Sequence, residues 1–402
     1  MHKKSGFGSA ALLICLIMVV GIMAAGCGKK KVSGSKSVYK IGVVLSLSQA
    51  QAALGVPEQN ALKLLEKKVN DEGGIEGHRV QFLIEDDESL PAKSKEKFTK
   101  LVNQEGVTAV IGTSFSGGTA AMTEDAEKNK IPLIGLSATT SLTHPVKKWT
   151  FRTPPTTQMV VERALGYIQK NLKLKKIGVL YDSGLFGTEG YETVKATAGK
   201  YGLEVVAAES YGTNDPDMTA QLTKIKSTPA QALIVWGTGP APSIIAKNVQ
   251  QLAMTIPYIG SHGIANQTFI NLAGDAANGV VFPAGRVLVP SSIPADSDWR
   301  KTVDEFAKSY KEAYKTEVNT FAGHGWDAGL IMTEAMKAAI KANGDQEKLS
   351  ASVIRDQIEK TKDLTGIAGA FTYSPSNHDG LKIDDLIMIK IENGAWTEAK
   401  SS

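Results

Sequence analysis

Two loops rich in serine, threonine and glycine carry the residue types that best suit the binding of a small anion. The first, Ser114–Thr119, reads Ser-Phe-Ser-Gly-Gly-Thr, and the second, Ser137–Thr140, reads Ser-Ala-Thr-Thr. Hydroxyl groups and free backbone N–H groups at the start of a helix bind a carboxylate without a full positive charge. We therefore expect Ser116 and its neighbours to hold a small carboxylate. The alternative is that the serines and glycines only cap a helix and form a turn.

Each polar loop follows a short apolar run with the length and β-branched content of a buried strand. These runs are Ala109–Ile111 and Ile131–Ile134, and the segment between them, Thr119–Asn129, has the length of a helix. The pattern predicts a βαβ unit whose strands end in the two polar loops. In open α/β sheets, ligands bind at this edge, outside the carboxyl ends of the strands.

The N-terminal residues 1–26 have the order of an export signal: a basic start, an apolar run and three small residues. The small residues before Cys27 resemble the lipobox of bacterial lipoproteins, which predicts lipidation of Cys27 and a polar, flexible tether over residues 27–37. Ala24 stands where the lipobox usually has Leu, and the alternative is a secreted protein with an unpaired thiol. The only other cysteine, Cys15, lies in the signal, so no disulfide is expected.

The export signal predicts a protein that works outside the cytoplasmic membrane, in the periplasm or at the outer face of the cell, and the composition is that of an ordinary globular protein. Hydrophobic residues make up 42% of the chain and charged residues 21%, with a formal net charge of +4. No basic stripe interleaved with aromatic residues occurs, which argues against nucleic acid as a partner. Residues 38–402 suit two domains better than one.

Two strand-like segments recur at one constant offset. Ala109–Thr113 is echoed by Ile234–Thr238, and Ile131–Gly135 is echoed by Ile256–Gly260, in both cases 125 residues later. The shared offset predicts two α/β lobes of related topology, each with a parallel sheet covered by helices. The alternative is that buried parallel strands simply look alike.

The other predicted elements alternate along both lobes. The expected strands are 39–45, 79–85, 176–182, 203–209, 232–236, 258–260 and 381–391. The expected helices are 57–71, 91–104, 160–172, 189–201, 218–227, 243–251, 298–314, 324–342 and 348–360. The stretches 151–156 and 283–294 contain prolines typical of loops, and we expect the chain to cross between the lobes there.

Short motifs follow one another in a characteristic order over nearly the whole chain after the tether. They are Ile41-Gly42, Asn70–Gly77, Glu85–Asp87, Val110–Gly112, Ile131–Ile134, Phe151–Thr153, Gln221–Lys226, Asn271–Ala276 and Trp326–Ala328. Each motif is weak alone. Their order and spacing resemble the extracytoplasmic solute-binding proteins of branched-chain amino-acid ABC transporters.

The resemblance implies an α/β fold of the type I periplasmic-binding class. Two Rossmann-like lobes with parallel-sheet cores and flanking helices would be joined by three hinge crossings, the third near 371–376. Lobe 1 would comprise residues 38–154 and 289–370, and lobe 2 residues 155–288 and 371–402. A ligand would be captured by closure of the cleft between them.

The resemblance also implies the residues that contact the ligand. They are Ser114, Phe115, Ser116, Ser137, Ala138, Thr139, Phe186, His262 and Trp326. In the family, the residue matching Ser116 anchors the ligand carboxylate. The position of Ser137 supplies a backbone carbonyl, and that of Thr139 supplies a hydroxyl.

The position that usually binds the ligand ammonium departs from the family pattern. His262 stands where binders of α-amino acids usually carry an acidic residue, and a neutral imidazole offers no negative charge. A hydrophobic or aromatic carboxylate is therefore as well supported as a branched-chain amino acid. The counter-interpretation is that Asp182 or Asp327 reaches the ammonium, and His262 can also be a purely structural residue.

The aromatic positions of the cleft are only partly kept. Phe186 retains a ring without the usual hydroxyl, Leu54 replaces an aromatic residue near the first helix, and the loop 237–240 has none. Trp326 holds the last aromatic position, although a Trp on a helix is more often part of a core. The pattern predicts a mainly apolar cleft.

The sequence gives little support for catalysis, a cofactor or a metal. It has no Gly-x-Ser-x-Gly elbow, no phosphate loop and no metal-ligand spacing. Catalysis is therefore not expected, and the resemblance implies a monomeric binding protein, anchored to the membrane by its lipid, which delivers solute to ABC permease subunits and their ATPases. The alternative is a sensory module that signals to a membrane receptor.

Overall fold

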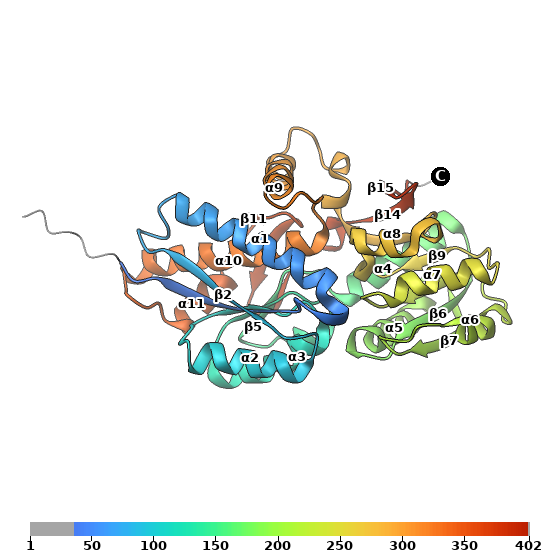
Figure 1. The fold of residues 1–402 in the computed structure, drawn as a ribbon, viewed down its shortest axis with the longest axis horizontal. Helices are drawn as coiled ribbons and strands as arrows, with labels where there is room; N and C mark the ends of the chain where they lie inside the picture. Colours follow the sequence, from blue (N-terminus) through green and yellow to red (C-terminus); the bar gives the residue numbers. More distant parts are fainter. Residues whose placement is uncertain (1–35, 401–402) are drawn as a thin grey trace, which may run out of the picture. The chain divides into compact units, whose positions relative to one another are not determined.

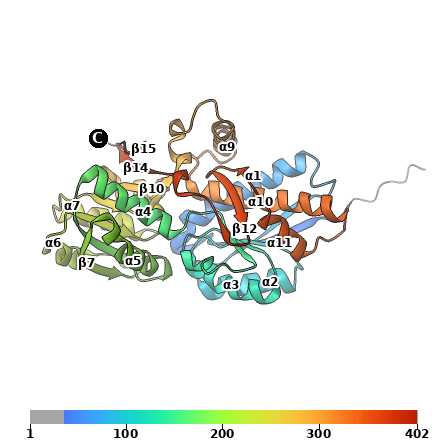
Figure 2. The same cartoon turned by 180° about the vertical axis from the view of Figure 1, so that it is seen from behind.

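The computed structural model describes residues 36–400. The predicted signal peptide, Cys27 and the tether before Lys36 lie outside the described residues and stay predictions. Within the described part, the strands form two main sheets, each with helices against it, and one small sheet (Figures 1 and 2). Among residues 36–400, no helix combines the length and the apolar character that crossing a bilayer requires.

The first sheet has five parallel strands in the order β2-β1-β3-β4-β5. They are β1 (Tyr39–Leu45), β2 (Val80–Asp86), β3 (Val110–Gly112), β4 (Leu133–Gly135) and β5 (Thr150–Arg152). Their apolar side chains are buried, as is usual for parallel strands covered on both faces. The sequence assigned most of β5 to a crossing, because three residues are too few to show a strand pattern.

Helices from two distant parts of the chain cover the first sheet. They are α1 (Ala52–Asp71), α2 (Pro91–Asn103) and α3 (Ser116–Asn129), joined by α10 (Thr320–Asn343) and α11 (Ala351–Glu359), while α9 (Asp298–Tyr314) packs on α1. The blue α1 packs beside the orange α10 (Figure 1). α9, α10 and α11 therefore lie with the first lobe, although they follow most of the second lobe in the sequence.

The second sheet has the order β15-β14-β10-β9-β8-β6-β7. Its strands are β6 (Lys176–Asp182), β7 (Glu204–Tyr211), β8 (Ala232–Trp236), β9 (Tyr258–Gly260), β10 (Val281–Gly285), β14 (Leu386–Glu392) and β15 (Ala395–Glu398). Its helices are α4 (Thr157–Tyr167), α5 (Leu185–Thr197), α6 (Thr219–Lys226), α7 (Ala241–Gln251) and α8 (Gln267–Ala273). β14 and β15 are antiparallel additions to a parallel core.

The two sheets share one topology. The order β7-β6-β8-β9-β10 in the second lobe repeats the order β2-β1-β3-β4-β5 in the first. The segments that recur 125 residues apart are β3 with β8 and β4 with β9, which occupy equivalent places in the two sheets. The prediction of two related α/β lobes is confirmed.

The last part of the chain crosses between the lobes later than expected. β11 (Leu364–Thr365), β12 (Ala370–Ser374) and β13 (Asn377–Gly380) form the small antiparallel sheet. Tyr373 Oη donates to the carbonyl of Arg152 at 2.7 Å, which holds β12 to the first lobe. The expected boundary before Phe371 does not match this pairing. We propose that lobe 1 extends to Gly380 and that the third crossing lies between Gly380 and β14.

Candidate functional site

A cavity of about 40 Å³ lies where the carboxyl ends of strands from both sheets meet. It is lined by Leu54, Ser114, Phe115, Ser116, Leu136, Ser137, Ala138, Pro154, Phe186, Thr238, His262, Gly263, Thr320, Phe321 and His324. All the predicted contact residues except Thr139 and Trp326 are in this set. The cavity has room for about three water molecules, so a ligand of leucine's size enters only when the lobes separate.

The start of α3 presents unused hydrogen-bond donors to the cavity. Ser116 is the first residue of α3, and Phe115 before it is extended and makes no side-chain cap. The backbone N–H groups of the first helical turn have no intrahelical partner. Ser116 is only 3% exposed and lines the cavity, and no hydrogen bond joins its hydroxyl to another residue among 36–400. Donors held ready in this way suit a carboxylate.

A glycine at the end of β3 allows the chain to enter this loop. Gly112 has φ of +126°, and a Cβ there would lie 1.9 Å from the carbonyl oxygen of Val44 on β1. No side chain fits at that distance, and this backbone region strongly favours glycine. Gly112 therefore sets the path that brings Ser116 to the cavity.

Ser114 plays a different part from Ser116, because its hydroxyl is already used. Its Oγ donates to Glu58 Oε2 at 2.5 Å and accepts from the backbone N–H of Ser46 at 3.2 Å. Burial raises the pKa of Glu58 well above its ordinary value, although the hydrogen bond from Ser114 opposes the shift. Ser114 thus fastens the loop to α1 and β1 and leaves the ligand to Ser116.

Arg152 fixes the second polar loop from behind. Its guanidinium donates to the carbonyls of Ala138 and Thr139, at 2.7 Å each, and lies 3.3 Å from the Asp379 carboxylate. The side chain is 1% exposed. In the same loop, Ser137 Oγ donates to Thr119 Oγ1 at 2.7 Å, so the loop is also tied to α3. The sequence marked Phe151–Thr153 as a motif but gave Arg152 no role.

Thr139 and Trp326 lie behind the surface that faces the cavity. Thr139 is fully buried, and its Oγ1 has no partner among the described residues. Trp326 packs on Phe306 of α9 with ring centroids 4.9 Å apart. On α10, Thr320 and His324 share one face, whereas Trp326 lies about 200° around the helix from His324. This rotation places Trp326 in the core and His324 in the cleft.

The face from the second lobe is aromatic and uncharged. His262 begins a short 3-10 helix after β9, and its ring meets that of Phe186 edge-on, with centroids 5.5 Å apart. Desolvation lowers the pKa of His262 to about 4, so the imidazole is neutral at pH 7. Among residues 36–400, no Asp, Glu, Lys or Arg lines the cavity. The cleft therefore offers no counter-charge to an ammonium group.

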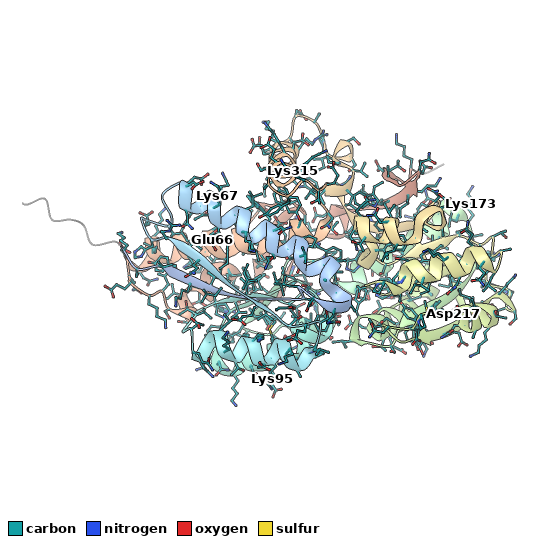
Figure 3. The ribbon with its side chains drawn as sticks, in the orientation of Figure 1. Glu66, Lys67, Lys95, Lys173, Asp217 and Lys315 are labelled. Atoms are coloured by element: carbon teal, nitrogen blue, oxygen red, sulfur yellow. The ribbon has the colours of Figure 1, made fainter. Side chains whose placement is uncertain are left out.

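The two acids suggested for an ammonium contact are engaged elsewhere. Asp182 accepts from the backbone N–H of Gly184 at 2.7 Å and from the Thr213 hydroxyl at 2.6 Å. Asp327 accepts from the backbone N–H groups of Ile367 and Ala368, at 2.6 and 2.8 Å. Neither residue lines the cavity. Other charged side chains, such as Lys67, Lys95 and Asp217, lie on exposed helix and loop surfaces (Figure 3).

One acidic side chain connects the lobes beside the cavity. Glu189 on α5 of the second lobe accepts from the backbone N–H of Thr140 and, at 2.8 Å, from the Ser141 hydroxyl. Both partners directly follow the loop Ser137–Thr139 of the first lobe. These hydrogen bonds exist only when the lobes are close together.

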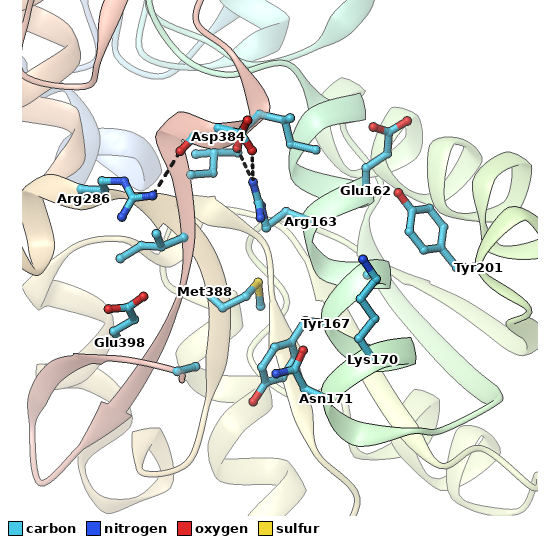
Figure 4. A pocket seen from close by; sticks show the side chains of 15 residues that line it. Glu162, Arg163, Tyr167, Lys170, Asn171, Tyr201, Arg286, Asp384, Met388 and Glu398 are labelled. Atoms are coloured by element: carbon cyan, nitrogen blue, oxygen red, sulfur yellow. Dashed lines mark hydrogen bonds and ion pairs between the residues drawn. The ribbon is translucent and has the colours of Figure 1, made fainter. Parts of the chain in front are cut away.

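A larger groove of about 590 Å³ lies away from these residues, between α4 and β14 (Figure 4). Arg163 donates to the Ile383 carbonyl at 2.7 Å, and Arg286 donates to the Asp384 carbonyl at 3.2 Å. The groove mixes acidic and basic side chains and contains none of the predicted contact residues. The smaller cavity, with its unused donors, is the better candidate site.

Comparison with known proteins agrees with this architecture. Residues 38–395 match the family described as "Periplasmic binding protein". The Leu/Ile/Val-binding protein BraC3 of Rhizobium johnstonii is 25% identical over 334 residues, which cover 83% of this chain and 86% of that protein. An extracellular ligand-binding receptor of Rhodopseudomonas palustris has a TM-score of 0.83 at 31% identity, covering 90% of this chain and 99% of the other. The substrate binding protein LivJ of Streptococcus pneumoniae, solved with isoleucine, has a TM-score of 0.79 at 25% identity, covering 91% and 99%.

Proposed function

The chain belongs to the periplasmic binding protein family, and from this premise we propose that it captures a small carboxylate outside the cytoplasm and delivers it to an ABC permease. The observation that carries the proposal is the start of α3. Ser116 brings a hydroxyl without a partner and the free N–H groups of a helix terminus to a cavity shared by both lobes. In these surroundings an anion gains hydrogen bonds that no protein group competes for.

Capture proceeds by closure of the lobes. The ligand docks first on the loops of lobe 1, which Arg152 and Glu58 hold in place without a ligand. Lobe 2 then closes, bringing Phe186 and His262 over the ligand. Glu189 completes the closure by bonding to Thr140 and Ser141. A ligand favours the closed form only through contacts that it makes with both lobes.

The character of the cleft bears on the class of ligand. The relative from Rhizobium johnstonii is named for Leu, Ile and Val, and the Streptococcus pneumoniae protein was solved with isoleucine. The cavity here keeps the apolar lining that such side chains need but has no acid for the ammonium. We infer that the cleft supports hydrophobic or aromatic carboxylic acids as ligands as well as it supports branched-chain amino acids.

Anchoring and the destination of the ligand are further proposals. The small residues before Cys27 support a lipoprotein held at the membrane surface. Delivery for uptake is favoured over signalling because the relatives matched along most of the chain include a transporter's substrate binding protein. Copurification of the intact chain with a permease supports delivery, whereas copurification with a receptor supports signalling.

Calorimetric titration tests the proposed ligand class. The purified protein is titrated with leucine, with the keto acid of leucine, with benzoate and with the methyl ester of benzoate. We expect the free acids to bind and the ester to fail, because the ester has lost the charge that the start of α3 recognises. Equal binding of acid and ester would overturn the proposal. Tight binding of leucine alone would restrict the ligand to α-amino acids.

A further inference from the structure

A second, smaller cavity lies directly behind the cleft. It measures about 10 Å³ and is bordered by Pro155, Ala284, Gly285, Ala368, Leu381 and Leu386, together with His262, Thr320 and His324. Pro155, Gly285 and Leu381 lie at or beside the three crossings between the lobes. His262, Thr320 and His324 line both cavities. The two imidazole rings therefore form part of the wall between the ligand cleft and the hinge.

Both histidines carry a buried nitrogen without a partner. The Nδ1 atoms of His262 and His324 are buried and make no hydrogen bond to any residue among 36–400. Buried polar atoms in native proteins are nearly always paired, either with protein groups or with bound molecules. The two residues come from different elements, the segment after β9 and α10, and both line the same two cavities. Each of these residues therefore has an unpaired ring nitrogen, and the fold brings the two residues together at one place.

The surroundings define the charge of the group that fits. Among the described residues, neither cavity is lined by an ionised side chain. Burial lowers the pKa of His324 to about 3, with His262 adding to the shift, so both rings are neutral at pH 7. Asp327, three residues after His324 on α10, accepts from the backbone N–H groups of Ile367 and Ala368. A cation or a second anion would lack a partner of opposite charge.

We propose that His262 and His324 together form a second polar subsite, which takes a hydroxyl group of the bound carboxylate. The inference rests on the proposed function, because it presumes a ligand whose carboxylate is held by Ser116. A neutral imidazole has one N–H and one acceptor nitrogen. A hydroxyl accepts a hydrogen bond from one ring and donates one to the other, so a single oxygen satisfies both histidines. An ammonium group can only donate and brings a charge that the subsite does not balance.

A matched ligand series tests the subsite. The protein is titrated calorimetrically with 4-methylpentanoate and its 2-hydroxy, 2-oxo and 2-amino derivatives, and with benzoate and 4-hydroxybenzoate. We expect a hydroxyl-bearing acid to bind about tenfold more tightly than its parent, as two added hydrogen bonds imply. The 2-oxo acid should fall between the two, because a carbonyl oxygen accepts but does not donate.

Two variants separate recognition from structure. In His262→Phe and His324→Phe, which keep a ring of similar size, the hydroxylated acid and its parent should bind with about equal affinity, so the preference is lost. His78→Phe, which changes a buried histidine outside both cavities whose ring stacks on Tyr39, is the control and should keep the full preference. Thermal melting of each variant reports its folding.

The outcomes distinguish the two levels of the proposal. If parent and hydroxylated acids bind equally to the wild-type protein, or if both histidine variants weaken all acids alike, the subsite is wrong but carboxylate capture stands. Preference for the 2-amino acid would also overturn the subsite. If no acid in the series binds, the proposed function fails, and the subsite fails with it.

Discussion

The two lobes meet the same cavity with opposite kinds of surface. On the first lobe, hydroxyls and backbone N–H groups gather at the start of α3, and a buried network around Arg152 and Glu58 holds them in place. On the second lobe, Phe186 and His262 supply aromatic, uncharged surface. The difference suggests a division of roles, in which the first lobe recognises the carboxylate and the second lobe selects the rest of the ligand.

The largest effect should follow from removing the internal support of the first lobe. In Arg152→Met, the buried Asp379 carboxylate loses its cation and keeps only the Thr143 hydroxyl and His144, and the Ala138 and Thr139 carbonyls lose the guanidinium. We expect the free energy of unfolding to fall by about 3–5 kcal/mol, as when one member of a buried pair is removed. Urea denaturation measures this change.

An exposed ion pair provides the control for Arg152→Met. Lys224→Met removes a pair with Glu209 whose lysine is 67% exposed, and such pairs contribute about 0–1 kcal/mol. If both variants unfold at the same urea concentration, the first lobe does not depend on Arg152 for its loop structure.

The next largest effect concerns the carboxylate itself. Ser116→Ala removes the hydroxyl at the start of α3 while leaving the backbone N–H groups. A hydrogen bond to a charged group contributes about 1.5–3 kcal/mol, so the dissociation constant of a carboxylate should rise about 10–100-fold. Calorimetry measures the change, and Ser227→Ala, at an exposed serine of the second lobe, should leave affinity intact. If Ser116→Ala binds the carboxylate with unchanged affinity, the Ser116 hydroxyl does not recognise the carboxylate, which contradicts the role given to the first lobe.

A smaller effect tests how the two lobes act together. Glu189→Ala deletes hydrogen bonds that form only in the closed arrangement, without touching a residue that lines the cavity. We expect ligand affinity to fall about 3–10-fold, because the open form becomes easier to populate. Calorimetry gives the affinity, and small-angle scattering gives the extent of opening.

Glu192 offers a matched control on the same helix. Glu192→Ala removes an exposed carboxylate that pairs only with Lys195 of α5. It should change neither affinity nor scattering. If Glu189→Ala behaves in the same way, the contact between α5 and the loop after Thr139 does not contribute to closure.

The smallest effect is a pH dependence from the histidines beside the second lobe. Burial lowers the pKa of His262 to about 4 and that of His324 to about 3, against an ordinary value of 6.5. The unfolded chain therefore binds more protons, and stability that is present above pH 6.5 is lost as pH falls towards 4. From pH 7 to 6 the two histidines together should remove about 1 kcal/mol.

Asp327 changes the free energy of unfolding with pH in the opposite direction to the histidines. The histidine effect is therefore measured as the difference between the wild-type protein and a variant without them. Burial raises the pKa of Asp327 to about 7, which favours the folded protein as pH falls through this range. The free energy of unfolding of wild type and of the double variant His262→Phe/His324→Phe is measured at pH 7 and 6. Parallel pH dependences of the two proteins would contradict the burial of neutral histidines.

Local sequence patterns were sufficient for most of the fold. The bounds predicted for β1, β6, β8, β9 and α9 agree with the structure, because apolar runs and a strong amphipathic repeat mark these elements. The start of α1 was placed at Pro57, but the helix begins at Ala52 and accommodates the proline. The later third crossing that we propose rests on long-range hydrogen bonds from β12 and β13 to Arg152 and Thr150, which no local pattern reveals.

The site was predictable where one segment carries it and not where distant segments meet. Ser116 follows from its own loop. His324 looked isolated in the sequence, since the fold alone brings it to a cavity shared with His262, 62 positions earlier. Trp326 was chosen by family position, and the rotation of α10 buries it instead. Glu58 and Arg152 support the loops through contacts that no local pattern encodes.

The central claim is that the start of α3 holds the carboxylate of the ligand, and a crystal structure with a bound acid tests it most directly. The predicted result is a carboxylate within hydrogen-bond distance of the Ser116 hydroxyl and the backbone N–H groups of the first turn of α3, enclosed by both lobes. An acid bound elsewhere, for example in the groove between α4 and β14, with residues 114–119 facing away from it, would contradict the account.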